Sequence, residues 1–122
     1  MTAYDKALAD YSEAIRLNPQ AATAFNNRGV TYADLKACAK ALADYNEAIH
    51  LNPQYAGAFY NRACAHALQG QLEQVLPALR RAFELDQAAD STRLVDLARN
   101  DADFDLFRTE PAFQALLAEF SA

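Results

Sequence analysis

Glycine, proline and cysteine are scarce in this sequence, with three, four and two copies among 122 residues. Because short strands joined by tight turns depend on glycine and proline, a loop-rich β protein is not expected. Neither Cys38 nor Cys64 belongs to a CxxC pair or to a Cys/His metal spacing. We therefore interpret both as reduced thiols in a packed interior, without a redox role.

Long apolar runs and an excess of basic residues are also missing. No stretch of about 18 apolar residues occurs, so the sequence predicts no transmembrane helix. The first residues lack the basic-then-apolar layout of a signal peptide, which favours a cytoplasmic location. With 16 acidic and 11 basic residues, the net charge of −5 argues against a nucleic acid or an anionic membrane surface as the partner.

What the chain has in quantity is alanine, leucine and the acidic and amide residues that favour helices. Hydrophobic residues make up 52% of the sequence, so a chain of this length can bury a core. We therefore expect a single all-α domain over residues 1–122.

A near-identical segment occurs twice. Residues 6–20, KALADYSEAIRLNPQ, return as residues 40–54, KALADYNEAIHLNPQ, with changes at two of the fifteen positions. The two Asn-Pro pairs, Asn18-Pro19 and Asn52-Pro53, set a repeat period of about 34 residues. A fixed period of this length is typical of proteins built from stacked helical repeats.

The period divides the chain into unequal units. We expect a half repeat at 2–21, a full repeat at 22–55, a degenerate repeat at 56–89 and capping helices at 90–122, where the period is no longer followed. Each Asn-Pro pair is predicted to end a helix, with the proline in the first turn of the next one. Gly29 falls inside a predicted helix, where glycine costs about 1 kcal/mol, and we expect it to allow close approach of the paired helix.

The spacing of the repeated residues resembles the tetratricopeptide repeat family. The family's aromatic, small, tyrosine, alanine and proline positions are matched by Phe25, Gly29, Tyr32, Ala41, Tyr45, Ala48 and Pro53. The resemblance extends over about residues 4–87. It implies a right-handed α-solenoid of stacked antiparallel helix pairs, with about two and a half repeats plus a C-terminal cap.

The C-terminal stretch DADFDLFRTEPAFQALL resembles the tail that caps many bacterial tetratricopeptide arrays. This resemblance implies a short helix near 91–98, a turn and a final helix near 111–120. It also implies five side chains that plug the last repeat: Phe104, Leu106, Phe107, Phe113 and Leu116.

No catalytic or metal-binding constellation is recognisable. Asp101, Asp103 and Asp105 share the start of a calcium-binding loop, but Leu106 and Ala112 occupy the positions where that loop needs glycine and glutamate. We expect these aspartates to cap helix ends and turns instead. The sequence therefore predicts no enzyme, no cofactor and no metal.

The resemblance implies a protein–protein interaction module that binds a peptide or protein in a concave groove, formed by the first helix of each unit. It places eight residues there: Asn26, Asn27, Val30, Asp34, Tyr60, Asn61, Cys64 and Leu68. For the repeat equivalents Asn27 and Asn61, two interpretations remain open, contact with a peptide and a bond between adjacent repeats. Some relatives clamp a chaperone-tail carboxylate with basic residues, but Gly57 and Asn61 occupy those positions here, so this clamp is not predicted.

The half repeat supplies a second helix without its partner. Its apolar face, formed by Tyr4, Leu8, Tyr11 and Ile15, therefore lacks a cover within the sequence. Three explanations remain open: the chain is a fragment of a longer array, two copies pair as a homodimer, or the face is a frayed edge. The second gives an alternative function, a self-associating assembly unit.

Overall fold

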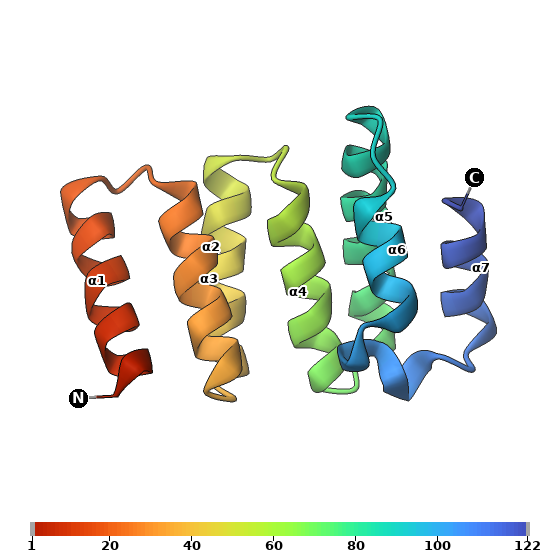
Figure 1. Ribbon diagram of the computed structural model, residues 1–122, viewed down its shortest axis with the longest axis horizontal. Coiled ribbons are helices and arrows are strands. Elements are labelled where there is room, and N and C mark those ends of the chain that lie inside the picture. The colour runs from red at the N-terminus through yellow and green to blue at the C-terminus, as the bar shows by residue number, and fades with distance from the viewer. Residues whose placement is uncertain (1, 122) are drawn as a thin grey trace.

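The computed structural model describes residues 2–121 and is built from helices throughout (Figure 1). The elements in chain order are α1 (Ala3–Leu17), α2 (Ala22–Asp34), α3 (Cys38–Leu51), α4 (Ala56–Leu68), α5 (Leu72–Ala88), α6 (Arg93–Asn100), the 3₁₀ helix η1 (Ala102–Phe107) and α7 (Pro111–Glu119). Consecutive helices run antiparallel and stack side by side. This arrangement is the expected all-α solenoid.

The helices form two layers. In Figure 1, α2, α4 and α6 lie toward the viewer, while α3 and α5 lie behind them. Helices α2 and α3 form one tightly packed pair and α4 and α5 the next, and α1 packs mainly against α2. The front layer therefore consists of the first helix of each pair.

The Asn-Pro pairs end helices as predicted, but the prolines lie elsewhere. Asn18 and Asn52 are the C-caps of α1 and α3, in extended conformation. Each asparagine side chain accepts a hydrogen bond from the backbone N–H two residues on, at 3.1 Å in both copies. Because these turns hold the prolines, Pro19 and Pro53 precede the next helices and are not in their first turns.

Gly29 fills the role expected of it. A Cβ atom at this position would lie 2.6 Å from Cε1 of Tyr45 and 3.2 Å from the carbonyl oxygen of Ala41. Helix α3 therefore approaches α2 too closely for any side chain at residue 29.

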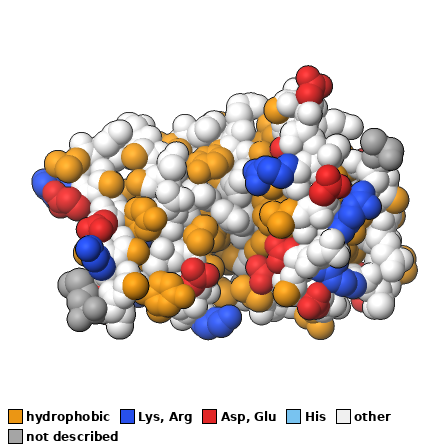
Figure 2. All heavy atoms as spheres, in the orientation of Figure 1, with side chains coloured by type: hydrophobic (Ala, Val, Ile, Leu, Met, Phe, Trp, Pro, Cys, Tyr) orange, Lys and Arg blue, Asp and Glu red, His pale blue; other side chains and the backbone are white. Residues whose placement is uncertain are grey.

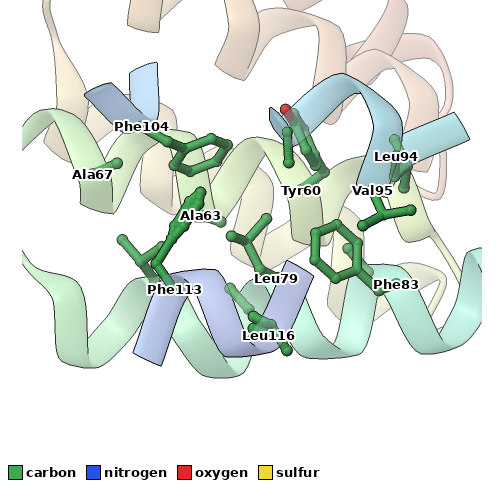
Figure 3. Close-up of a cluster of buried hydrophobic side chains, with 14 of the residues drawn as sticks. Tyr60, Ala63, Ala67, Leu79, Phe83, Leu94, Val95, Phe104, Phe113 and Leu116 are labelled. Atoms are coloured by element: carbon green, nitrogen blue, oxygen red, sulfur yellow. The ribbon is translucent and has the colours of Figure 1, made fainter. Parts of the chain in front are cut away.

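The main hydrophobic core lies in the C-terminal half. Figure 3 shows side chains from α4, α5, α6, η1 and α7 meeting in one buried cluster. Phe104 contacts the rings of Tyr60 and Phe113 edge-on, with centroids 5.7 and 5.6 Å apart. A smaller cluster of Ala41, Tyr45 and Ala65 holds the middle of the molecule.

Four of the five predicted capping side chains are buried: Phe104, Phe107, Phe113 and Leu116. The prediction for Leu106 is wrong, because its side chain is 68% exposed. In a 3₁₀ helix residues three apart share a side, so Phe104 and Phe107 both face the core while Leu106 points outward.

The cap preserves the period that its sequence has lost. Leu94 on α6 lies one repeat period after Tyr60 on α4, and Phe113 on α7 lies one period after Leu79 on α5. All four side chains are buried in the same cluster. Helices α6 and α7 thus occupy the places of a further, shortened helix pair.

Within residues 2–121, none of the helices has both the length and the apolar character needed to cross a membrane.

Candidate functional site

A cleft of about 360 Å³ opens between the helices of the front layer. Figure 2 views this face and shows hydrophobic side chains spread across it, with acidic side chains among them toward the end where α4 meets η1. Its lining comes from α2, α3, α4 and α6 and from the start of η1: Val30, Ala33, Asp34, Tyr45, Gly57, Tyr60, Asn61, Cys64, Ala65, Leu68, Arg93, Leu94, Leu97, Asp101 and Asp103.

Six of the eight residues predicted for the groove line this cleft: Val30, Asp34, Tyr60, Asn61, Cys64 and Leu68. Asn26 and Asn27 do not. Asn26 is buried, and its side-chain oxygen accepts a hydrogen bond from Nδ2 of Asn61 at 3.1 Å. Asn61 therefore does link adjacent repeats, but through Asn26 and not through its repeat equivalent, Asn27.

The apolar part of the cleft comes from three successive helices. Val30 on α2, Leu68 on α4 and Leu97 on α6 are 37%, 44% and 46% exposed. The exposed part of each side chain contacts water, and a bound ligand or partner would bury this apolar surface.

Asp101 lies at the centre of a polar group at the lower end of the cleft. Its Oδ2 accepts a hydrogen bond from the Tyr60 hydroxyl at 2.7 Å and lies 3.9 Å from Sγ of Cys64. Its Oδ1 accepts from the backbone N–H of Asp103 at 3.0 Å, so Asp101 caps η1 as predicted. These two hydrogen bonds thus hold the Asp101 carboxylate inside the cleft.

The pKa values in this group are displaced by burial and by neighbouring charge. Burial raises the pKa of Asp103, and the negative charge of Asp101 raises it further. Burial likewise raises the pKa of Cys64, with Asp101 and Asp103 adding to the effect. The pKa of Tyr60 is also raised, by burial and then by its hydrogen bond to Asp101. The thiol and the phenol are therefore neutral and unreactive at neutral pH.

Cys64 Sγ and one carboxylate oxygen each of Asp101 and Asp103 lie within 4.8 Å of one another, as metal ligands would. A metal needs the thiolate form of cysteine, and the raised pKa of Cys64 opposes that form. The hydrogen bonds to Asp101 account for the grouping, so we describe it as a polar cluster.

The two ends of the cleft differ in charge. Asp34, Asp101 and Asp103 line one end, and none of them forms an ion pair with another residue in the range 2–121. Arg93 lines the other end, at the start of α6. Since α6 has eight residues, about 12 Å separates its two ends.

Sequence reasoning missed the contribution of the cap to this site. Arg93, Leu97, Asp101 and Asp103 belong to the segment 90–122, which the sequence predicts only as capping helices, yet they form one side of the cleft. The available signal was the period itself, because Leu94 follows Tyr60 by one full period and both line the cleft.

Helix α1 presents a second surface. None of its residues is buried, although its sequence nearly repeats that of α3, which buries Ala41, Asp44, Tyr45 and Ala48. Of the predicted face, Leu8, Tyr11 and Ile15 are partly covered by α2, while Tyr4 is exposed. The difference arises because α1 has one neighbouring helix where α3 has two.

Known proteins give the same repeat and the same fold. Family models match at residues 3–36, described as TPR repeat, and at residues 22–55 and 44–76, described as tetratricopeptide repeat. Among solved structures, the TPR2B domain of yeast Sti1, in a complex with pHsp70, aligns with a TM-score of 0.72 and 26% identity, covering 92% of this chain and 84% of that one. No curated protein matches the sequence. Because the repeat models span residues 3–76 and the helices stack as in that domain, the chain belongs to the tetratricopeptide repeat family.

Proposed function

We propose that this protein is a non-catalytic interaction module that binds a peptide or a protein segment in the cleft of α2, α4 and α6. The observation that carries the proposal is the row of exposed apolar side chains, Val30, Leu68 and Leu97, across three successive helices. The similar yeast Sti1 domain, whose structure is that of a complex with pHsp70, supports a protein or peptide as the ligand class.

The dimensions of the cleft suit an extended segment. Its lining runs over three helices of the front layer, and adjacent helices pack about 8–10 Å apart. Tyr60 contributes less surface than the sequence suggested, because its ring is buried and its hydroxyl is bonded to Asp101. Contact with the ligand therefore falls mainly to the exposed apolar side chains and to the polar groups beside them.

The chemistry of the cleft supports binding in preference to catalysis. The thiol of Cys64 and the phenol of Tyr60 line the cleft, and the pKa of each is raised, which disfavours the anionic form that a nucleophile needs.

Capture from a cell lysate with paired variants tests the cleft. Leu68→Gln/Leu97→Gln places polar groups in the cleft, and Leu17→Gln/Leu106→Gln makes the same chemical change at exposed leucines outside it. We expect mass spectrometry to identify a partner that the wild type and the second variant retain and the first variant loses. A partner retained equally by both variants would exclude the cleft as its binding site.

A second candidate is self-association through α1. It is favoured by the contrast between α1, with no buried residue, and the nearly identical α3. In this case we expect sedimentation equilibrium to give a concentration-dependent dimer that Leu8→Gln/Ile15→Gln abolishes. A monomer over the full range from micromolar to millimolar concentration would rule this candidate out.

A further inference from the structure

We infer that the ligand of this cleft is a basic peptide, whose Lys or Arg side chain lies among Asp34, Asp101 and Asp103 while a neighbouring apolar side chain packs on Leu68 and Leu97. The inference rests on the proposed function and names the chemical class of the partner. A basic side chain complements the three carboxylates that line one end of the cleft.

Within residues 2–121, no Lys or Arg side chain forms an ion pair with Asp34, Asp101 or Asp103 at the acidic end of the cleft. Asp101 uses its oxygens to accept from Tyr60 and from the backbone of Asp103, which are neutral donors. Arg108 is nearby, but it donates to the backbone oxygen of Asp101 and forms its ion pair with Asp105. No ion pair within residues 2–121 therefore occupies the carboxylates of Asp34, Asp101 and Asp103.

The neighbouring charges do not cancel the repulsion inside this group. Burial raises the pKa of Asp103 most, and the charge of Asp101 raises it further. Lys36 lowers this pKa by a smaller amount than Asp101 raises it, and Asp34 adds a smaller increase. A ligand ammonium or guanidinium would relieve the repulsion and would replace lost hydration with charge-assisted hydrogen bonds. A ligand carboxylate would increase it.

The cleft also gives the ligand a direction. The acidic end lies beyond the C-terminus of α6 and Arg93 lies at its N-terminus, about 12 Å apart along the helix. The exposed Leu97 lies between them. The matching segment is therefore basic at one end and apolar in the middle, with an acidic or neutral residue tolerated at the end near Arg93.

Selection of a random decapeptide library on the intact chain tests the inference. We expect the enriched peptides to carry Lys or Arg beside an apolar residue, and to bind the wild type in fluorescence anisotropy with EDTA present, which removes any divalent cation. The variant Asp34→Asn/Asp103→Asn should weaken binding roughly tenfold through loss of charge-assisted contacts. Both changes keep side-chain size and leave the capping carboxylate of Asp101 in place.

Asp10→Asn/Asp90→Asn is the matched control, because it removes two acidic charges outside the cleft. It should bind as the wild type does. Replacing the peptide's Lys by norleucine should cause a similar tenfold loss in the wild type and little further loss in Asp34→Asn/Asp103→Asn. Raising the salt concentration should weaken binding to the wild type more than to that variant.

Two results would overturn the inference in different ways. Enriched peptides that are acidic or neutral, or that ignore Asp34→Asn/Asp103→Asn, while still losing affinity to Leu68→Gln/Leu97→Gln, would refute the basic ligand and leave the peptide-binding function standing. A library that yields no peptide sensitive to Leu68→Gln/Leu97→Gln would refute both.

Discussion

At the scale of single residues, one ion pair distinguishes otherwise equivalent positions of the repeat. Arg28 on α2 donates two hydrogen bonds of 2.8 Å to the carboxylate of Asp44 on α3, whose side chain is 7% exposed. The equivalent of Asp44 on α1 is Asp10, which is exposed. On α5 the equivalent of Asp44 is Ala78. Arg62 on α4, the equivalent of Arg28, therefore lacks this carboxylate and donates to Asn46 on α3 at 3.2 Å.

Asp44→Ala should therefore lower the free energy of unfolding by about 3 kcal/mol, because it leaves the guanidinium of Arg28 partly buried without its partner. Asp10→Ala removes the same residue from the same local sequence, and should change stability by less than about 0.5 kcal/mol. Urea unfolding of both variants measures the difference. Equal effects would mean that the local sequence, and not the ion pair, sets the cost.

The charge of Asp103 should reduce stability at neutral pH. Its pKa is raised in the folded state above the ordinary value of 3.8, so folding favours the protonated form. The protein therefore loses stability as the pH rises from 3.8 through the folded pKa. Asp103→Asn should be more stable than the wild type at pH 7, by about 0.5 kcal/mol from a relieved like-charge contact, and equal to it well below the ordinary pKa. Thermal unfolding at both pH values gives the comparison, and a destabilised variant at pH 7 would contradict it.

At the scale of helices, the contact of α2 with α3 depends on a complementary pair of residues. Gly29 faces the ring of Tyr45, with no room for a Cβ. In the next pair the same two positions hold Ala63 and Leu79, both buried. The same contact is thus made by a glycine against a tyrosine ring in the first helix pair and by an alanine against a leucine in the second.

Gly29→Ala should destabilise the protein by roughly 1–2 kcal/mol, since overpacking outweighs the helix propensity gained. The double variant Gly29→Ala/Tyr45→Leu carries an alanine against a leucine, as the second unit does. Its loss of stability should be smaller than the sum of the two single losses, with a coupling energy of about 1 kcal/mol in a double-mutant cycle. Gly57→Ala is the control, because the added Cβ would lie at an ordinary contact distance of 3.5 Å from the ring of Tyr55. This substitution should stabilise α4. Additive effects of the first two changes would show that Tyr45 does not impose the glycine.

The helices were predictable from the sequence to the extent that they repeat. The repeat predicted helix ends at the two Asn-Pro pairs, where α1 and α3 do end, and a need for smallness at Gly29. The period could not be recognised after residue 88, where the sequence no longer resembles the earlier repeats. The buried residues Leu94 and Phe113 nevertheless keep the spacing of the period. Sequence identity decays faster than the spacing of buried residues. The segment of α6 was therefore predicted only as a capping helix, and its side of the cleft was missed.

The two asparagine positions show a different limit. Asn27 and Asn61 are equivalent by number, but the hydrogen bond between repeats joins Asn61 to Asn26. In a stack, one face of each unit meets the opposite face of the next, so a residue need not contact its own repeat equivalent across the interface. Contacts between units therefore needed the structure, whereas contacts within a unit followed from spacing.

At the scale of the whole molecule, the core is unevenly distributed along the solenoid. The large cluster joins α4, α5, α6, η1 and α7, a cluster of three residues serves the middle, and α1 buries no residue. In a solenoid each unit is stabilised mainly by its neighbours. Stability should therefore decrease from the C-terminal half toward α1.

Native-state hydrogen exchange should detect this gradient. We expect the amides of α1 to exchange through local opening at low free energy, those of α2 and α3 at intermediate values, and those of α4 and α5 only through global unfolding. Phe113→Ala should cost about 3–5 kcal/mol and lower the protection of α4 and α5 while leaving α1 little changed, because α1 already opens independently. If α1 were instead as well protected as α4, its apolar face would be covered in solution, and protection that rises with protein concentration would identify a second copy as the cover.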